Sequence, residues 1–264
     1  MMPLPRTMRA VVCHAPEDYR LETMPVPEAG PGEVIIRVDA AGICASDVKC
    51  YTGAPMLWGD EHRVGYCQAP ITAGHEFIGT VAALGEGAAA QYGLALGDRA
   101  ISEQIVPCWE CRYCRRGLYH LCAVHDIYGF RRATPGGWAD YMKFPAGALN
   151  HKVPSELQIE YAALIEPLAC SMHAVRRGNI EFGDTVVVAG CGTIGLGIVA
   201  YARQKSPAAV VAVDLSDDRL ARAKKLGATH TLNPRTQDVP QCVLDMTDGY
   251  GCDVYIEATG APAS

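Results

Sequence analysis

The chain has 264 residues, which is enough for one large domain or two moderate ones. Its composition, 49% apolar and 20% charged residues, is typical of a globular protein and excludes a disordered one. A net charge of −6 excludes the broad basic surface that nucleic-acid binding needs. The N-terminus lacks the apolar core of a secretory signal, so the twelve cysteines indicate the reducing cytoplasm, where thiols bind metal or pack in a core.

Residues 1–165 are rich in Val and Ile, with frequent Gly and Pro turns, and predict an irregular β-rich domain. Two of its segments carry candidate ligands. The segment AAGICASDVK contains Cys44, which taken alone is more often a small buried hydrophobe than a ligand. The segment AGHEFIGTVAALG contains His75 and Glu76, which place two ligand types on one glycine-flanked turn.

The stretch PCWECRYCRRGLYHLC (residues 107–122) spaces four cysteines as C-x2-C-x2-C-x7-C. The reducing compartment argues against disulfides, and the segment is too polar for four core cysteines. The acidic net charge and the missing second ligand cluster disfavour a nucleic-acid finger. Four thiolates hold Zn²⁺ tetrahedrally with no open position, so the spacing predicts a structural zinc lobe over about residues 104–123 that does no chemistry. Its ligands are Cys108, Cys111, Cys114 and Cys122.

Glu166 is a carboxylate in the otherwise apolar run ALIEPLAC, at the start of a predicted linking helix over residues 166–178. A buried uncompensated charge is costly, so this carboxylate needs a partner. One thiolate, one imidazole and one or two carboxylates would hold Zn²⁺ with an open position for water or substrate, which is the catalytic kind of site. The residues that can supply them are Cys44, His75, Glu76 and Glu166.

The most apolar window, residues 185–202, has the length of a membrane helix, but four glycines interrupt it. We therefore predict a strand, a turn and a helix there, and no membrane segment. The turn has the pattern G-x-G-x-x-G, formed by Gly190, Gly192 and Gly195. The first glycine permits the tight turn, the second lets the backbone approach a pyrophosphate, and the third lets helix and strand pack closely.

A second strand ends at Asp214, which lies 24 residues after Gly190 (214 − 190), close to the expected offset for a carboxylate that binds ribose hydroxyls. Asp214 would repel a 2′-phosphate, so NAD is favoured over NADP. Arg219 tempers this preference, because an arginine near the adenosine can accept a phosphate.

Alternating strands and helices after residue 180 predict a parallel sheet with right-handed crossovers. A full dinucleotide-binding sheet has about six strands, so we expect a chain truncated at its C-terminal end. The four predicted strands are 185–189, 209–214, 229–232 and 253–258.

These motifs, taken together and in order, resemble those of the zinc-dependent medium-chain alcohol dehydrogenases, in the branch that includes sorbitol and other polyol dehydrogenases. The matching pieces are GICASD, GHEFIG, the four-cysteine lobe, LIEPLAC and GCGTIG with its downstream acid. The resemblance implies an α/β chain: a GroES-like catalytic domain over residues 1–165, then an incomplete Rossmann domain over 166–264. It also implies two zinc ions per chain and a homo-oligomer, a dimer or tetramer.

The resemblance also assigns roles to single residues. Cys44, His75 and Glu76 become the catalytic zinc ligands, and Glu166 either is an exchangeable ligand or holds a water at the metal. Ser46 matches the hydroxyl that passes the substrate proton outward. Ile194 is expected to pack at the cofactor and Arg219 to lie along its adenosine end.

Two departures from the family pattern concern the substrate region. Lys49 stands where the family usually has the histidine that ends the proton relay, and a charged lysine is a poor proton acceptor. The spacing from Cys44 to His75 is longer than usual, because of a Pro- and Gly-rich loop at residues 55–70. This loop either borders the substrate, with Trp58 and Tyr66 as walls, or is a surface excursion. A similar long loop occurs in dehydrogenases of short polyols such as erythritol and threitol.

The predicted function is hydride transfer between a secondary alcohol, a polyol, and NAD. A threonine-type amino-alcohol dehydrogenase shares nearly every motif and is the alternative within the family. The alternative from another class is a non-catalytic fragment that binds zinc and nucleotide. The remaining cysteines show no ligand spacing and are expected only to pack; they are Cys13, Cys50, Cys67, Cys170, Cys191, Cys242 and Cys252.

Overall fold

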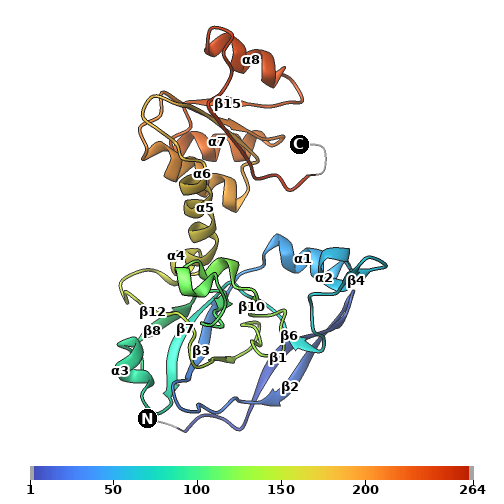
Figure 1. Cartoon of the computed structure of the whole chain (residues 1–264), viewed down its shortest axis with the longest axis vertical. Helices are drawn as coiled ribbons and strands as arrows, with labels where there is room; N and C mark the ends of the chain where they lie inside the picture. The colour runs from blue at the N-terminus through green and yellow to red at the C-terminus, as the bar shows by residue number, and fades with distance from the viewer. Residues whose placement is uncertain (1–2, 262–264) are drawn as a thin grey trace. The chain divides into compact units, whose positions relative to one another are not determined.

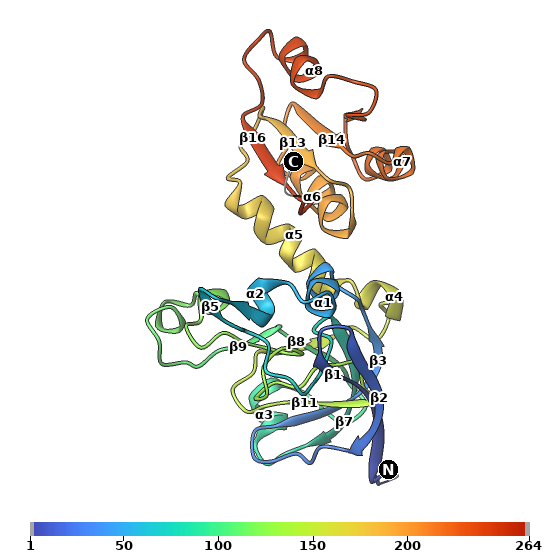
Figure 2. The same ribbon diagram turned by 90° about the vertical axis from the view of Figure 1, so that its right-hand side faces the viewer.

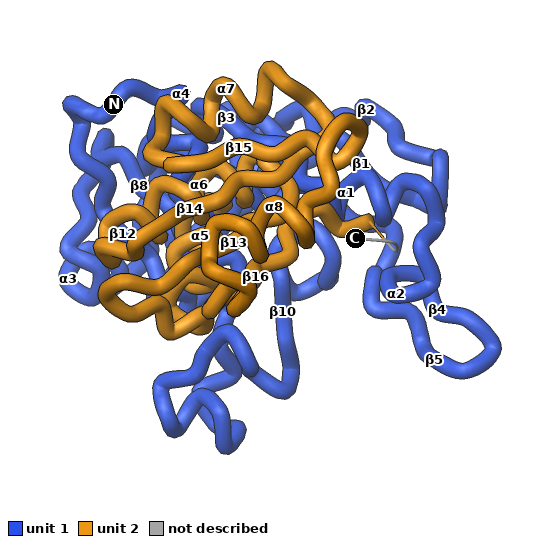
Figure 3. The backbone as a smooth tube through the Cα atoms, turned by 90° about the horizontal axis from the view of Figure 1, so that it is seen from above, with its two compact units in different colours: residues 1–166 blue, residues 167–264 orange. Residues whose placement is uncertain are grey.

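The computed structural model describes residues 3–261 and divides into two compact units, Met1–Glu166 and Pro167–Ser264 (Figure 3). The first unit consists mainly of antiparallel strands, and the second contains a parallel sheet with helices. The predicted fold class, a β-rich domain followed by an α/β domain, is therefore confirmed. Among residues 3–261, no helix combines the length and the apolar character needed to cross a membrane.

The first unit contains a five-stranded antiparallel sheet in the order β11-β3-β7-β8-β12 (Figure 1). Alternate side chains of a strand point to opposite faces, and Val34 and Ile36 of β3 meet Phe77 and Val81 of β7 in one buried core cluster. The strands are β3 (Val34–Ala41), β7 (Phe77–Leu84), β8 (Arg99–Ser102), β11 (Tyr141–Phe144) and β12 (Asn150–Val153).

A second, three-stranded sheet of the first unit has the order β2-β1-β6. Its strands are β1 (Thr7–Ala15), β2 (Asp18–Pro25) and β6 (Ile71–Thr72). The chain then passes from β6 through a turn into β7, and from β3 into helix α1 (Ala45–Tyr51). The short helices α3 (Ala88–Tyr92) and α4 (Ile159–Ala162) complete this unit outside the cysteine lobe and the 55–70 segment.

The segment 55–70 is more ordered than the predicted loop. Its first residues form helix α2 (Pro55–Trp58), and the next form the small hairpin β4 (Gly59–Asp60) and β5 (Arg63–Val64). The sequence signal was misleading because proline is favoured in the first turn of a helix, and Pro55 stands there. Trp58 and Tyr66 both pack on the buried cluster around Phe130.

The second unit contains a four-stranded parallel sheet in the order β15-β14-β13-β16. All four predicted strands are present, each within two residues of its expected ends. They are β13 (Thr185–Ala189), β14 (Ala209–Val213), β15 (His230–Leu232) and β16 (Val254–Glu257). The apolar stretch 185–202 is divided between β13 and helix α6, as its glycines indicated.

Helices cover both faces of this sheet, as expected for a doubly wound fold (Figure 2). Val186 and Val188 of β13 pack with helices α6 and α7, whereas Val187 faces the cluster that contains Val243 of α8. The helices are α5 (Ile165–Arg177), α6 (Thr193–Arg203), α7 (Asp217–Lys225) and α8 (Val239–Met246). Helix α5 is the linking helix predicted at residues 166–178.

Candidate metal and cofactor sites

Cys44 lies at the N-cap of helix α1, in extended conformation. Asp47, three residues later, accepts a hydrogen bond from the Cys44 N–H at 2.8 Å. This is the backbone half of a capping box, and it fixes the start of the helix. The position of the Cys44 thiol is therefore set by local sequence.

His75 and Glu76 lie on the turn between β6 and β7. The turn needs Gly74, which has φ +91° and sits so close to Trp138 that an added Cβ would lie 2.2 Å from the indole Cδ1. Strand pairing then brings this turn to α1, because Gly42 N donates to the carbonyl oxygen of Glu76 at 2.7 Å. The ligand atoms of Cys44, His75 and Glu76 consequently lie within 4.8 Å of one another.

These three side chains suit a zinc ion. The set combines a thiolate, an imidazole and a carboxylate, and it leaves a fourth position of a tetrahedron open. Gly42 is part of the fit, since a Cβ there would lie 2.2 Å from Glu76 Oε2. The absence of a side chain at this position is thus required for the carboxylate to point inward.

Asp47 has a second contact that the sequence analysis did not foresee. Its Oδ1 lies 3.3 Å from Nδ1 of His75, and both side chains are buried, at 3% and 4% exposure. Burial by itself would lower the pKa of His75, but contacts with Asp47 and Cys44 outweigh it and raise the pKa to about 10. A carboxylate on one ring nitrogen orients the ring and leaves Nε2 for a metal. The sequence signal for this contact was Asp47 itself, an acidic residue three positions after Cys44.

The other residues assigned to this site are carried by helices α1 and α5. Ser46 is partly buried in the first turn of α1, and Lys49 is exposed in its last turn. Glu166 stands in the first turn of α5 and is not among the three residues whose ligand atoms gather within 4.8 Å.

The four cysteines of the lobe also come together. Their sulfur atoms all lie within 4.8 Å of one another, and Cys108 Sγ and Cys114 Sγ are 4.0 Å apart. Tetrahedral zinc with Zn–S of about 2.3 Å requires about 3.8 Å between sulfurs, so the spacing fits. Backbone N–H groups donate to these sulfurs, and those of Ala123 and Cys114 lower the pKa of the Cys111 thiol to about 6. The lobe also contains β9 (Ile105–Val106), η1 (Cys114–Arg116) and η2 (Tyr119–Leu121). Strand β10 (Asp126–Ile127) follows the lobe and pairs with β9.

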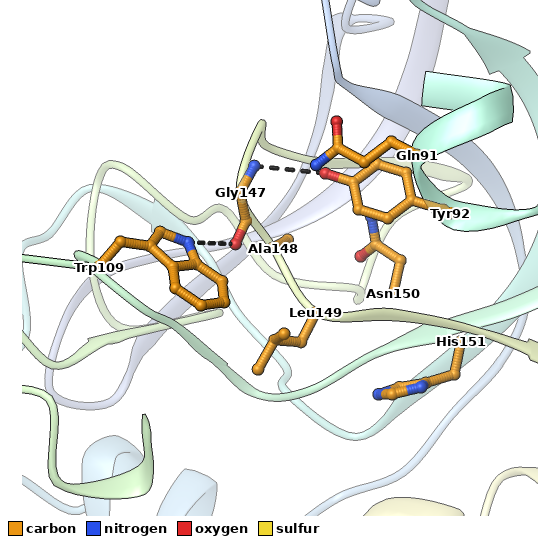
Figure 4. Close-up of a pocket in the computed structure, with 8 residues that line it drawn as sticks. All are labelled: Gln91, Tyr92, Trp109, Gly147, Ala148, Leu149, Asn150 and His151. Atoms are coloured by element: carbon orange, nitrogen blue, oxygen red, sulfur yellow. Dashed lines mark hydrogen bonds between the residues drawn. The ribbon is translucent and has the colours of Figure 1, made fainter. Parts of the chain in front are cut away.

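A pocket of about 410 Å³ lies beside the lobe and contains no predicted ligand (Figure 4). Trp109 of the lobe donates its indole N–H to the carbonyl oxygen of Gly147 at 2.8 Å, and Gly147 N donates to the Tyr92 hydroxyl at 3.3 Å. The pocket therefore marks where the lobe is attached to the rest of the first unit. Its lining residues are Gln91, Tyr92, Trp109, Gly147, Ala148, Leu149, Asn150 and His151.

The glycine-rich turn of the second unit has the geometry that its pattern predicts. Gly190 has φ +91°, and an added Cβ would lie 2.8 Å from backbone atoms of Ala258. A Cβ on Gly195 would lie 1.7 Å from the carbonyl oxygen of Gly190, whereas Gly192 has no heavy atom within 4 Å of its Cβ position. Two glycines thus permit close packing, and Gly192 leaves open space at the N-terminus of α6 for a phosphate group.

Asp214 follows β14 and is held by two backbone amides. Cys191 N donates to Oδ2 at 2.7 Å, and Ser216 N donates to Oδ1 at 2.9 Å. Nη1 of Arg219 lies 3.8 Å from Oδ2. Ile194, in the first turn of α6, is partly buried against the core of the sheet. The structure thus places Asp214 next to the glycine-rich turn, with its carboxylate fixed in orientation.

Three cysteines that were expected only to pack are brought together. The sulfur atoms of Cys13, Cys50 and Cys67 lie within 4.8 Å of one another. Their sequence separation gave no signal, because they come from β1, α1 and the segment after β5.

Comparison with known proteins gives matches over both units. A model described as the alcohol dehydrogenase GroES-like domain matches residues 30–155, and one described as zinc-binding dehydrogenase matches residues 193–264. An erythritol/L-threitol dehydrogenase of Mycolicibacterium smegmatis is 56% identical over 257 residues, covering 97% of this chain and 71% of that protein. A sorbitol dehydrogenase of Bacillus subtilis is 36% identical, covering 99% and 71%.

Among solved structures, 2R,3R-butanediol dehydrogenase from Bacillus subtilis is similar with a TM-score of 0.81 and 35% identity. The similarity covers 97% of this chain and 72% of that one. The fold is therefore shared over nearly the whole chain.

Proposed function

Since the chain belongs to the family of zinc-dependent alcohol dehydrogenases, we propose that it transfers a hydride between a secondary alcohol group of a small polyol and NAD. The observation that carries this proposal is the convergence of Cys44, His75 and Glu76, three ligand types that leave one position open. The structural neighbours and relatives that share this fold are dehydrogenases by name.

In the proposed mechanism, Cys44, His75 and Glu76 hold the catalytic zinc, and Asp47 orients the ring of His75. When bound, zinc acts as a Lewis acid that makes an alcohol hydroxyl easier to deprotonate. Ser46 receives the proton of the substrate hydroxyl and passes it outward. Because Lys49 replaces the usual histidine, we propose that the relay ends in solvent water at this exposed position.

Glu166 is proposed as a carboxylate that exchanges with substrate or water at the open position. The second zinc, at Cys108, Cys111, Cys114 and Cys122, is proposed to be structural. Four thiolates leave no position for a substrate.

The cofactor is proposed to be NAD, bound at Gly190, Gly192, Gly195 and Asp214. Open space at Gly192 suits a pyrophosphate, and the fixed carboxylate of Asp214 suits two ribose hydroxyls. The same carboxylate would repel a 2′-phosphate at close range. Arg219 is already within 3.8 Å of Asp214, so part of its charge is balanced by that carboxylate. Ile194 and Arg219 are proposed to lie along the cofactor.

A short polyol is favoured as the substrate by the similarity to an erythritol/L-threitol dehydrogenase. The first unit also carries the ordered 55–70 segment, which begins four residues after the end of α1 (55 − 51), the helix that carries Ser46. A homo-oligomer is part of the same proposal.

A substrate panel tests the proposal. Zinc-loaded protein is assayed for NADH formation with erythritol, threitol, sorbitol, 2,3-butanediol and threonine, with NAD and with NADP. Turnover of a tetritol with NAD, lost in Cys44→Ala together with one zinc, is the expected result. Turnover of threonine alone would favour the amino-alcohol alternative. Retention of zinc and nucleotide without turnover of any alcohol would favour the non-catalytic alternative.

A further inference from the structure

Cys13, Cys50 and Cys67 form a cluster of three thiols, here called the thiol triad, that no part of the proposed dehydrogenase mechanism uses. Their sulfur atoms lie within 4.8 Å of one another. Cys13 and Cys50 are each 1% exposed, and Cys67 is partly buried. The four sulfurs of the lobe satisfy the same 4.8 Å limit.

The surroundings of the thiol triad are apolar on most sides. The packed residues include Leu57, Ile71, Ala73 and Phe130, with the rings of Trp58 and Tyr66 at the margin. Tyr19 also packs against this cluster, and its hydroxyl can supply an oxygen ligand. A cluster of sulfurs with one phenolic oxygen resembles the donor set of a thiolate-rich metal site more than that of a disulfide.

Two features of the local structure hold the sulfurs in place. Cys67 N donates to the carbonyl oxygen of Leu57 at 2.8 Å, and Nε1 of Trp58 donates to the carbonyl oxygen of Cys50 at 2.7 Å. The first bond closes the 55–70 segment on itself, and the second joins this segment to the end of α1. Helices α1 and α2 lie side by side (Figures 1 and 2). The thiols are therefore positioned by backbone contacts and not only by side-chain packing.

The thiolate is the form of cysteine that binds metal. A bound metal would allow all three thiols to ionise, because its positive charge offsets their mutual repulsion.

We propose that Cys13, Cys50 and Cys67 form a third metal site, for Zn²⁺, with the Tyr19 hydroxyl or a water as the fourth donor. A disulfide between any two of these residues would leave the third sulfur unused. Three thiolates and one oxygen, in contrast, satisfy a tetrahedral ion that prefers sulfur and nitrogen ligands.

The metal would join three parts of the first unit that are far apart in sequence. Cys13 lies in β1, Cys50 in the last turn of α1, and Cys67 after the β4–β5 hairpin. Helix α1 begins at Cys44, so one helix of seven residues would connect this site with the proposed catalytic zinc. The role that follows is to fix α1 and the 55–70 segment, and hence Ser46.

Zinc counting tests this site. The 264-residue chain is purified under reducing conditions after expression with added zinc, and zinc per chain is measured by mass spectrometry of the metal. Wild type is expected to hold one zinc more than Cys67→Ala, the triad variant whose side chain is least buried. Cys242→Ala, a partly buried cysteine of the second unit, is the matched control and should hold as much zinc as wild type. Because the test is a difference, it does not depend on the two other sites being full.

A second measurement needs no variant. Native protein is treated with N-ethylmaleimide before and after mild chelation, and the modified cysteines are identified by peptide mass. The site is supported if Cys67 is protected from N-ethylmaleimide before chelation and modified after it, and if the zinc difference is also found. Equal zinc in wild type and Cys67→Ala, with Cys67 modified equally before and after chelation, would overturn it. A peptide linked by a disulfide between two triad cysteines under the reducing conditions would also overturn it.

Discussion

Gly190 and Gly183 provide a matched pair that separates backbone strain from steric contact in the cofactor-binding turn. Gly190 has φ +91° and Gly183 has φ +90°, so alanine at either position adopts the same unfavourable backbone conformation. A Cβ at Gly183 has no heavy atom within 4 Å, whereas a Cβ at Gly190 lies 2.8 Å from backbone atoms of Ala258 and Thr259. The two variants thus share the strain and differ in the contact.

The expected magnitudes follow from these two terms. The left-handed conformation costs a non-glycine residue about 1–2 kcal/mol, which is the whole expected loss for Gly183→Ala. The contact at Gly190 is with backbone and not with a flexible side chain, so it adds an overpacking term of about 1–3 kcal/mol. Gly190→Ala should therefore lower the free energy of unfolding of the second unit by more than Gly183→Ala, by about the size of that second term.

Urea unfolding provides the assay, because two probes separate the two units. All three tryptophans, Trp58, Trp109 and Trp138, lie in the first unit, so their fluorescence reports on residues 1–166. Far-UV circular dichroism also reports on the helices of the second unit. The dichroism transition should shift in both variants, further in Gly190→Ala, while the fluorescence transition stays in place. Equal shifts for the two variants would refute the argument that Gly190 is needed for the close approach of β16.

Three further predictions concern the proposed catalytic metal. Asp47→Asn removes the charge beside His75 and should weaken zinc binding at that site about 10- to 100-fold, as measured by chelator competition. Asp18→Asn, at an exposed ion-pair residue, is the control and should leave the zinc affinity unchanged. An unchanged affinity in Asp47→Asn would contradict the role of Asp47. Gly42→Ala should displace the Glu76 carboxylate, because the added Cβ would lie 2.2 Å from Oε2, and should therefore lower the zinc content by one ion. Gly87→Ala is the control and should keep the full zinc content, because a Cβ there has no heavy atom within 4 Å. The pKa of His75 is raised from 6.5 to about 10, so in the zinc-free protein its protonated form contributes stability that is fully present below pH 6.5 and is lost as the pH rises through about 10. Zinc needs the neutral ring, so its affinity should increase over the same interval in chelator competition at several pH values, and a flat profile would show that His75 does not exchange a proton for the metal.

The local motifs were predictable from the sequence because the groups that act together are close in the chain. The four lobe cysteines lie within fifteen residues, and their spacing alone indicated a common site. The turn at Gly190, Gly192 and Gly195 was equally local, since all three glycines lie between one strand and the first turn of the helix that follows it. The contact of Gly190 with Ala258, in contrast, involves a distant part of the chain. The apolar runs that became β13 and β14 are short and bounded by glycine or by polar residues, which is why their ends were predicted within two residues.

The grouping of distant residues depended on strand pairing that no local pattern encodes. Cys44 lies near His75 because β3 pairs with β7 in a register that places Gly42 against Glu76. Before the structure, this grouping rested on ligand chemistry and on family resemblance. Asp47 was in view within GICASD, yet its contact with the His75 ring exists only once α1 lies against the turn after β6. The thiol triad is the clearest case: Cys13, Cys50 and Cys67 have no common spacing, and only the packing of β1, α1 and the 55–70 segment brings their sulfurs within 4.8 Å. A side chain's neighbours within a turn follow from the chain's own geometry, whereas neighbours across a sheet follow from register, which the burial of the whole domain sets.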